Sequence, residues 1–108
     1  MSDGLKDSHR ETILAILGAH PGVTGAVLFG SRAMGTFTPE SDIDICLLGG
    51  TLTLTDQARL SARLEATTIP QKVGLVLHRH IDSKELLDHI RDHGQVLLDK
   101  SVSWADRR

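Results

Sequence analysis

The sequence is poor in aromatic residues and in cysteine. Its 108 residues include two phenylalanines, one tryptophan and no tyrosine, so the hydrophobic core has to be built from aliphatic side chains. The one cysteine, Cys46, excludes an internal disulfide bond and fits a reducing compartment. Because it lies between Ile45 and Leu47 in an apolar run, we expect Cys46 to be a small buried core residue.

Long apolar runs and an excess of charge of one sign are also lacking. No apolar run approaches the roughly 18 residues of a membrane-spanning helix, and residues 1–10 contain no apolar signal segment. We therefore expect a cytoplasmic protein with no membrane partner. Twelve basic residues stand against fourteen acidic ones. This balance gives no support for direct nucleic-acid binding, which needs a basic face.

Length and periodicity indicate one small α/β (α+β) domain over residues 1–100, followed by a polar C-terminal tail, 101–108. The apolar pattern predicts helix, strand, strand, helix, strand, helix and strand in that order. We expect a small mixed β-sheet with helices packed against it. The expected strands are 23–29, 42–48, 73–77 and 96–98. The expected helices are capped by Ser8, by Thr55, and by Asp82 or Ser83, and end near 18–22, 67 and Gly94.

The most informative stretch is 28–48, where ten residues separate a Gly-Ser pair from an Asp-x-Asp pair. Strand residues alternate between faces, so Asp42 and Asp44 share a face, with Cα atoms roughly 6.5 Å apart at about 3.3 Å per residue. Two carboxylates this close repel each other unless a cation lies between them. Oxygen ligands suit Mg²⁺ or Mn²⁺, which bind phosphate oxygens at the same time.

The Gly-Ser pair supplies the complementary half of a metal-nucleotide site. Gly30 allows the backbone to approach a phosphate closely, and the Ser31 hydroxyl and nearby amides can donate to it. Residues 31–34 could form a short helical turn, with Ser31 as its N-cap. Arg32 has two open interpretations: it binds a triphosphate oxygen, or it pairs with Glu40 at the surface. The alternative for the aspartates, a solvated edge strand, leaves the spacing to the Gly-Ser pair unexplained.

A resemblance to a known family is carried by two motifs, Gly30-Ser31-Arg32-Ala33-Met34-Gly35 and Ser41-Asp42-Ile43-Asp44-Ile45. Together they resemble the minimal nucleotidyltransferase (MNT) family of the polymerase-β-like superfamily, and the similarity covers most of the chain. The resemblance implies the polymerase-β-like nucleotidyltransferase fold. It also implies that Asp42 and Asp44 are catalytic and bind metal, while Gly30, Ser31 and Arg32 bind the nucleotide.

The activity implied by this resemblance is transfer of a nucleoside monophosphate, expected to be AMP from ATP, with Mg²⁺ or Mn²⁺ as cofactor. Short proteins of this family often pair with a HEPN-domain toxin as its antitoxin, and the MNT chain can adenylylate its partner. The chain is short for carrying an acceptor-binding domain of its own. We therefore expect a hydroxyl group of a protein partner, a HEPN-type toxin, to be the acceptor.

One position departs from the family pattern. MNT chains usually carry a third aspartate in the third strand, where this chain has Gly74. By resemblance the missing carboxylate would hold metal or take the proton of the attacking hydroxyl, a contribution of about 10²–10⁴-fold in rate. Asp82 is a weaker candidate for a substitute. The alternatives are a weakened enzyme, a non-catalytic antitoxin or adaptor, and a nucleotide sensor that transfers nothing.

Two histidine pairs have spacings found in metal sites. His78 and His80 alternate at the end of the expected strand 73–77, and His89 and His93 stand four residues apart on the expected last helix. Neither pair has a convincing third ligand nearby in the sequence. We expect both pairs to lie on exposed polar faces.

Overall fold

The computed structural model describes residues 3–100. Its elements, in chain order, are α1 (Asp7–Gly18), β1 (Gly25–Phe29), α2 (Ser31–Met34), β2 (Ile43–Leu48), α3 (Leu54–Glu65), β3 (Val73–Leu77), the 3-10 helix η1 (His78–His80), α4 (Lys84–His93) and β4 (Gln95–Asp99). The predicted order is confirmed, and α2 lies where a helical turn was expected. The predicted polar tail, 101–108, lies outside the described residues.

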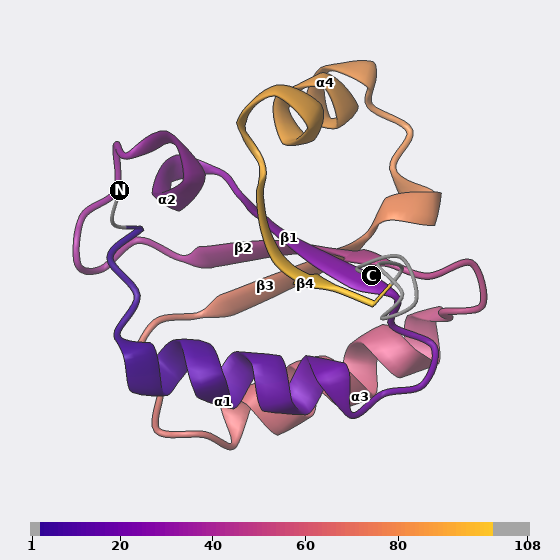
Figure 1. Ribbon diagram of the computed structural model, residues 1–108, viewed down its shortest axis with the longest axis horizontal. Coiled ribbons are helices and arrows are strands. Elements are labelled where there is room, and N and C mark those ends of the chain that lie inside the picture. Colours follow the sequence, from indigo (N-terminus) through magenta and orange to yellow (C-terminus); the bar gives the residue numbers. More distant parts are fainter. Residues whose placement is uncertain (1–2, 101–108) are drawn as a thin grey trace, which may run out of the picture.

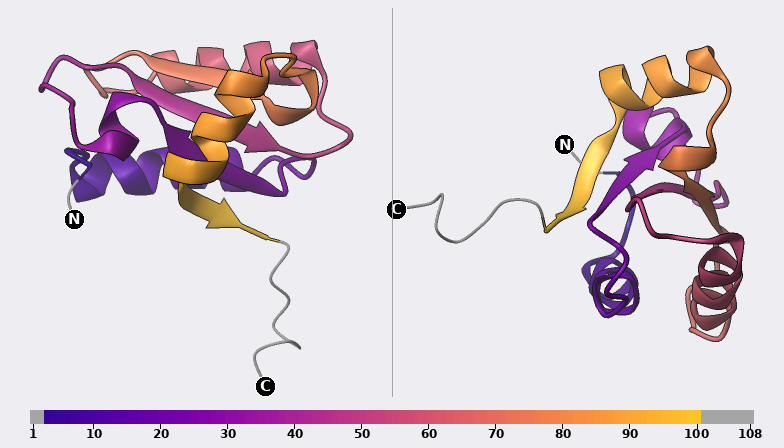
Figure 2. Two further views of the ribbon diagram at one scale, coloured as in Figure 1. Left: turned by 90° about the horizontal axis from the view of Figure 1, so that it is seen from above. Right: turned by 90° about the vertical axis from the view of Figure 1, so that its right-hand side faces the viewer.

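The four strands form one mixed sheet in the order β3-β2-β1-β4. Strand β1 is antiparallel to both β2 and β4, whereas β2 is parallel to β3. Helices α1 and α3 cover one face of the sheet, and α4 stands on the other face (Figures 1 and 2). The predicted mixed sheet with packed helices is therefore confirmed. Within residues 3–100 no helix has the length and apolar character needed to cross a membrane.

Side chains along β2 alternate between the hydrophobic core and the opposite face of the sheet. Ile43, Ile45 and Leu47 are buried in the aliphatic core, together with side chains of α1 and α3. The residues between them point the other way, toward the face on which α4 stands. Cys46 is buried there, as expected for a small core residue.

Several predicted element boundaries are wrong by one or two residues. Helix α1 begins at Asp7, whose negative charge in the first turn interacts favourably with the helix dipole. Ser8 therefore lies inside the helix instead of capping it. Helix α3 is capped by Thr53 and not by Thr55, because Asp56 completes a reciprocal capping box with Thr53. The structure confirms Ser83 as the cap of α4, where its hydroxyl accepts the Leu86 N–H at 3.2 Å.

The predicted strand starts at Val23 and Asp42 are also corrected, since β1 begins at Gly25 and β2 at Ile43.

Candidate functional site

The chain leaves β1 at a corner that requires glycine. Gly30 has a backbone φ of 77°, a conformation that other residues rarely adopt. A Cβ atom at this position would lie 2.5 Å from Oδ2 of Asp44. The β1–β2 register explains this approach, because Phe29 pairs directly with Asp44. The structure therefore brings the Gly-Ser pair and the aspartates of the motif together.

The two aspartates share the sheet face that carries no α1 or α3. Asp44 belongs to β2 and is half-buried, and Asp42 directly precedes the strand and is exposed. Burial raises the pKa of the Asp44 carboxyl above its ordinary value, and the negative charge of Asp42 raises it further. A cation beside the two carboxylates would offset this repulsion.

The donor set at this position fits Mg²⁺ or Mn²⁺. Mg²⁺ is usually held by one or two carboxylates and completes its shell with water and substrate phosphates. Within residues 3–100 no group of three His, Cys, Asp or Glu side chains could hold a metal ion by itself. A metal ion on Asp42 and Asp44 would thus depend on water and nucleotide for its other ligands.

Gly74 lies beside Asp44 in the parallel β2–β3 register. A Cβ atom at Gly74 would lie 3.4 Å from Oδ1 of Asp44, which is ordinary van der Waals contact. The position therefore has room for a third carboxylate next to the first two. The idea that Asp82 substitutes for it is not supported. Asp82 follows the far end of β3 and lines a cavity with residues of α3 and α4.

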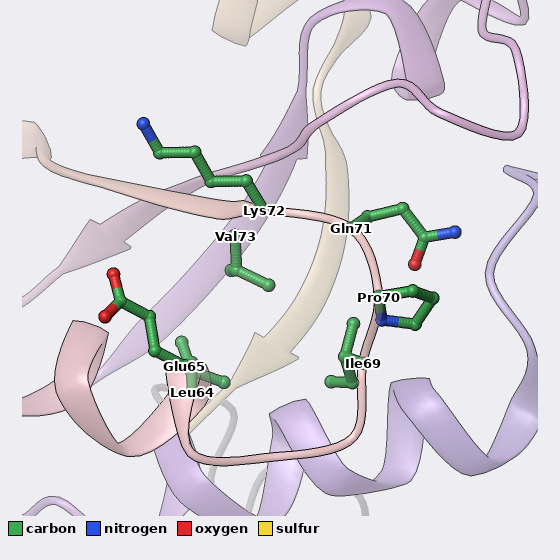
Figure 3. A pocket seen from close by; sticks show the side chains of 7 residues that line it. All are labelled: Leu64, Glu65, Ile69, Pro70, Gln71, Lys72 and Val73. Atoms are coloured by element: carbon green, nitrogen blue, oxygen red, sulfur yellow. The ribbon is translucent and has the colours of Figure 1, made fainter.

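Lys72 adds a positive charge near the aspartates. It precedes β3 as Asp42 precedes β2, and its carbonyl accepts the Ile43 N–H at 2.8 Å. Figure 3 shows the Lys72 side chain extending to the opposite side of the strand from Val73, which faces the core side. Lys72 and Asp42 both line a cavity of about 420 Å³. Lys72 was not predicted as a site residue, because only the parallel pairing of β2 and β3 places it here.

Arg32 supports the loop and is not available to a nucleotide. Its side chain is 1% exposed, and the guanidinium carbon lies 5.2 Å from the centroid of the Phe37 ring. All three guanidinium nitrogens donate to backbone carbonyl oxygens, at 3.0 to 3.5 Å. The acceptors belong to Asp3, Thr38, Pro39 and Ser41. Both interpretations, triphosphate binding and pairing with Glu40, are therefore corrected, because Arg32 instead anchors the loop that leads to Asp42.

His89 of α4 reaches the Gly-Ser corner, which is formed by Gly30 and Ser31 where the chain passes from β1 into α2. The Gly30 N–H donates to its Nε2 at 2.9 Å, and its ring meets the Phe29 ring edge-on with centroids 6.2 Å apart. The expectation of an exposed position is wrong for His89, which is half-buried, and confirmed for His93. No local signal in the sequence reveals this contact, since 59 residues separate its partners.

His78 and His80 are exposed as expected, in η1 and not at a strand end.

Comparisons with known proteins agree with this geometry. The model of the family described as Polymerase beta, Nucleotidyltransferase matches residues 11–103. A chain from a toxin–antitoxin structure with AMP-PNP superimposes with a TM-score of 0.69 and 28% identity, covering 95% of this chain and 79% of that chain. None of the curated proteins matches.

Two further solved structures show the same fold. One contains a tri-AMPylated Shewanella oneidensis HEPN toxin in complex with an MNT antitoxin, with a TM-score of 0.68, 25% identity and coverage of 90% and 75%. The other is a putative nucleotidyltransferase from Sulfolobus solfataricus, with a TM-score of 0.51, 21% identity and coverage of 81% and 73%. The family match spans both halves of the Gly-Ser and Asp-x-Asp motif, and the fold agrees with it. The chain therefore belongs to the polymerase-β nucleotidyltransferase family.

Proposed function

We propose that this protein is a metal-dependent nucleotidyltransferase that moves AMP from ATP to a hydroxyl group of a protein acceptor. The acceptor is a HEPN-type toxin, for which this chain is the antitoxin. The observation that carries the proposal is the close approach of the Asp44 carboxylate to Gly30, where an added Cβ atom would lie 2.5 Å from Oδ2, with the charge of Asp42 acting on the same carboxylate. Similarity to toxin–antitoxin structures that contain AMP-PNP or an AMPylated HEPN toxin supports the choice of donor and partner.

Each residue of the site has a distinct task in this proposal. Asp42 and Asp44 would hold Mg²⁺ or Mn²⁺, which when bound would neutralise charge on the nucleotide phosphates. The Ser31 hydroxyl, which has no hydrogen-bond partner among residues 3–100, donates to a phosphate oxygen. Gly30 lets the backbone approach the phosphates. Lys72 adds positive charge at the same end of the sheet.

The transfer forms one bond and breaks one bond. The acceptor oxygen bonds to the α-phosphorus of ATP, and the bond from that phosphorus to the bridging oxygen of pyrophosphate breaks. Gly74 offers no carboxylate to take the hydroxyl proton, so the proton passes to water. We therefore expect slow transfer, supported mainly by positioning and by charge neutralisation.

The proposal is tested with ATP labelled at the α-phosphate, MgCl₂ and a purified HEPN-type toxin, the acceptor that the proposal names. Label is expected on the toxin with the wild-type chain and none with the Asp42→Asn/Asp44→Asn double variant. Absence of label on the toxin with the wild-type chain would count against transfer.

Gly74 favours a second candidate function, a non-catalytic antitoxin or adaptor that uses the same fold as a binding surface. Co-expression with the toxin separates the two functions. If the Asp42→Asn/Asp44→Asn variant neutralises the toxin as fully as the wild-type chain, binding alone is sufficient. If neutralisation is lost while the complex still forms, transfer is required.

A further inference from the structure

The hydrogen bond from the Gly30 N–H to His89 Nε2 ties α4 to the Gly-Ser corner. Helix α4 stands on the same face of the sheet as the two aspartates (Figure 2). To accept this bond, Nε2 must be unprotonated, so the imidazole is neutral with its proton on Nδ1. The bond joins a rigid helix to a glycine, the residue with the greatest conformational freedom.

The Gly30 peptide is held on both sides. Its carbonyl accepts the N–H groups of Ala33 and Met34 at 3.1 and 3.2 Å. On the amide side, among residues 3–100, the acceptor is His89. Rotation of the peptide that precedes Gly30 would break this bond. Together these bonds restrain the backbone at Gly30, next to the Asp44 carboxylate.

The surroundings of His89 make it a firm anchor. Its ring is half-buried and packs edge-on against Phe29, the last residue of β1. The C-terminal end of α4 lies close on β1, since a Cβ atom at Gly94 would be 2.6 Å from Cγ1 of Val27. Such close packing leaves α4 little room to shift relative to the strand that ends in the corner.

We propose that His89 is a positioning residue, which holds the Gly-Ser corner beside the Asp44 carboxylate and so strengthens nucleotide binding. This inference rests on the proposed nucleotide site. His89 touches neither the acceptor nor the reacting phosphorus in this account. It acts through the Gly30 peptide.

Binding of ATP in MgCl₂, measured by calorimetry, tests the inference with three variants. His89→Leu keeps the bulk and removes the acceptor, whereas His89→Gln offers a side-chain oxygen to the same N–H. His78→Ala is the control, because His78 is an exposed histidine away from the corner. Loss of one hydrogen bond predicts a roughly two- to tenfold rise in Kd for His89→Leu. His89→Gln and His78→Ala should bind ATP with the Kd of the wild-type chain, so that only His89→Leu shows the rise.

Nuclear magnetic resonance of the wild-type chain without nucleotide gives an independent test. A scalar coupling between the Gly30 amide nitrogen and His89 Nε2 is expected, together with slow exchange of the Gly30 amide. Both should disappear in His89→Leu while the rest of the sheet remains protected. Absence of the coupling in the wild-type chain would overturn the inference.

The two tests keep this inference apart from the proposed function. If the wild-type chain binds no ATP, the nucleotide site is refuted and with it the effect of His89 on binding, and the coupling still decides whether His89 holds the corner. If the wild-type chain binds ATP and His89→Leu binds it equally well or better, the positioning role is refuted and the nucleotide site stands.

Discussion

Restoring a carboxylate at position 74 tests whether the site is a weakened enzyme. The Gly74→Asp side chain would start from a Cβ atom 3.4 Å from Oδ1 of Asp44, without a steric clash. It would add a carboxylate beside Asp44, one of the two proposed metal ligands. A general base contributes about 10²–10⁴-fold in rate. We therefore expect transfer of label from ATP to the toxin to rise by a factor in this range.

The same substitution should destabilise the metal-free protein. A carboxylate built on that Cβ lies on the order of 4–5 Å from the Asp44 carboxylate, where the repulsion is about 1–4 kcal/mol at effective dielectric constants of about 20–80. A glycine inside a strand is destabilising by about 0.5–1 kcal/mol relative to alanine, so its replacement offsets only part of this repulsion. In a domain of this size, each kcal/mol lost lowers Tm by about 4–8 °C.

Gly74→Asn is the matched control, since it has the same shape without the charge. In EDTA, the Tm of Gly74→Asp should be lower than the Tm of Gly74→Asn, and MgCl₂ with ATP should narrow this difference in Tm. Transfer should rise in Gly74→Asp alone. Equal transfer by the wild-type chain and both variants, together with equal melting of the two variants in EDTA, would refute the placement of position 74 beside the metal site.

Three further predictions follow from individual side chains. Burial, and then the charge of Asp42, raises the pKa of Asp44 in the fold. The folded state thus holds the proton more tightly than the unfolded state does. The free energy of unfolding therefore falls as the pH rises above the pKa that Asp44 has in the unfolded state. At pH 7 without metal, Asp44→Asn should therefore have a higher urea midpoint than the wild-type chain, and at pH 3 it should not. Equal midpoints at pH 7 would contradict this prediction. Arg32→Lys should lower the free energy of unfolding, measured by urea titration, by about 2–4 kcal/mol, because buried carbonyls lose their hydrogen-bond donors. An unchanged urea midpoint would show that other donors satisfy these carbonyls. Burial raises the pKa of the Cys46 thiol to about 11, so iodoacetamide at pH 8 should modify it only after unfolding, whereas rapid labelling of the native chain would refute its burial.

Local patterns were sufficient to predict the aspartate pair and its strand. Side-chain alternation depends only on neighbouring residues, so Asp42 and Asp44 could be placed on one face and Ile43 and Ile45 on the other before the sheet was known. The predicted strand Val73–Leu77 also has the observed bounds. The Thr53–Asp56 capping box was not predicted, since the cap was expected at Thr55, although the aspartate stands three residues after Thr53.

Long-range contacts account for what the sequence analysis missed. Arg32 was expected to bind a triphosphate oxygen or to pair with Glu40, and only the folded loop supplies the backbone carbonyls that bury it. Lys72 joins the site through strand pairing, and His89 joins it through the packing of α4 on β1. No periodicity or spacing encodes these contacts, since each depends on segments that meet only in the tertiary structure.

The central claim is that Asp42 and Asp44 together hold a divalent ion opposite the Gly-Ser corner. It is tested most directly by anomalous diffraction from crystals of this protein grown with Mn²⁺ and AMP-PNP. The account predicts a manganese peak within about 2.0–2.3 Å of oxygens from both carboxylates, with the phosphates of the analogue beside Ser31. A peak elsewhere, or bound analogue with both carboxylates turned from its phosphates, would contradict the claim.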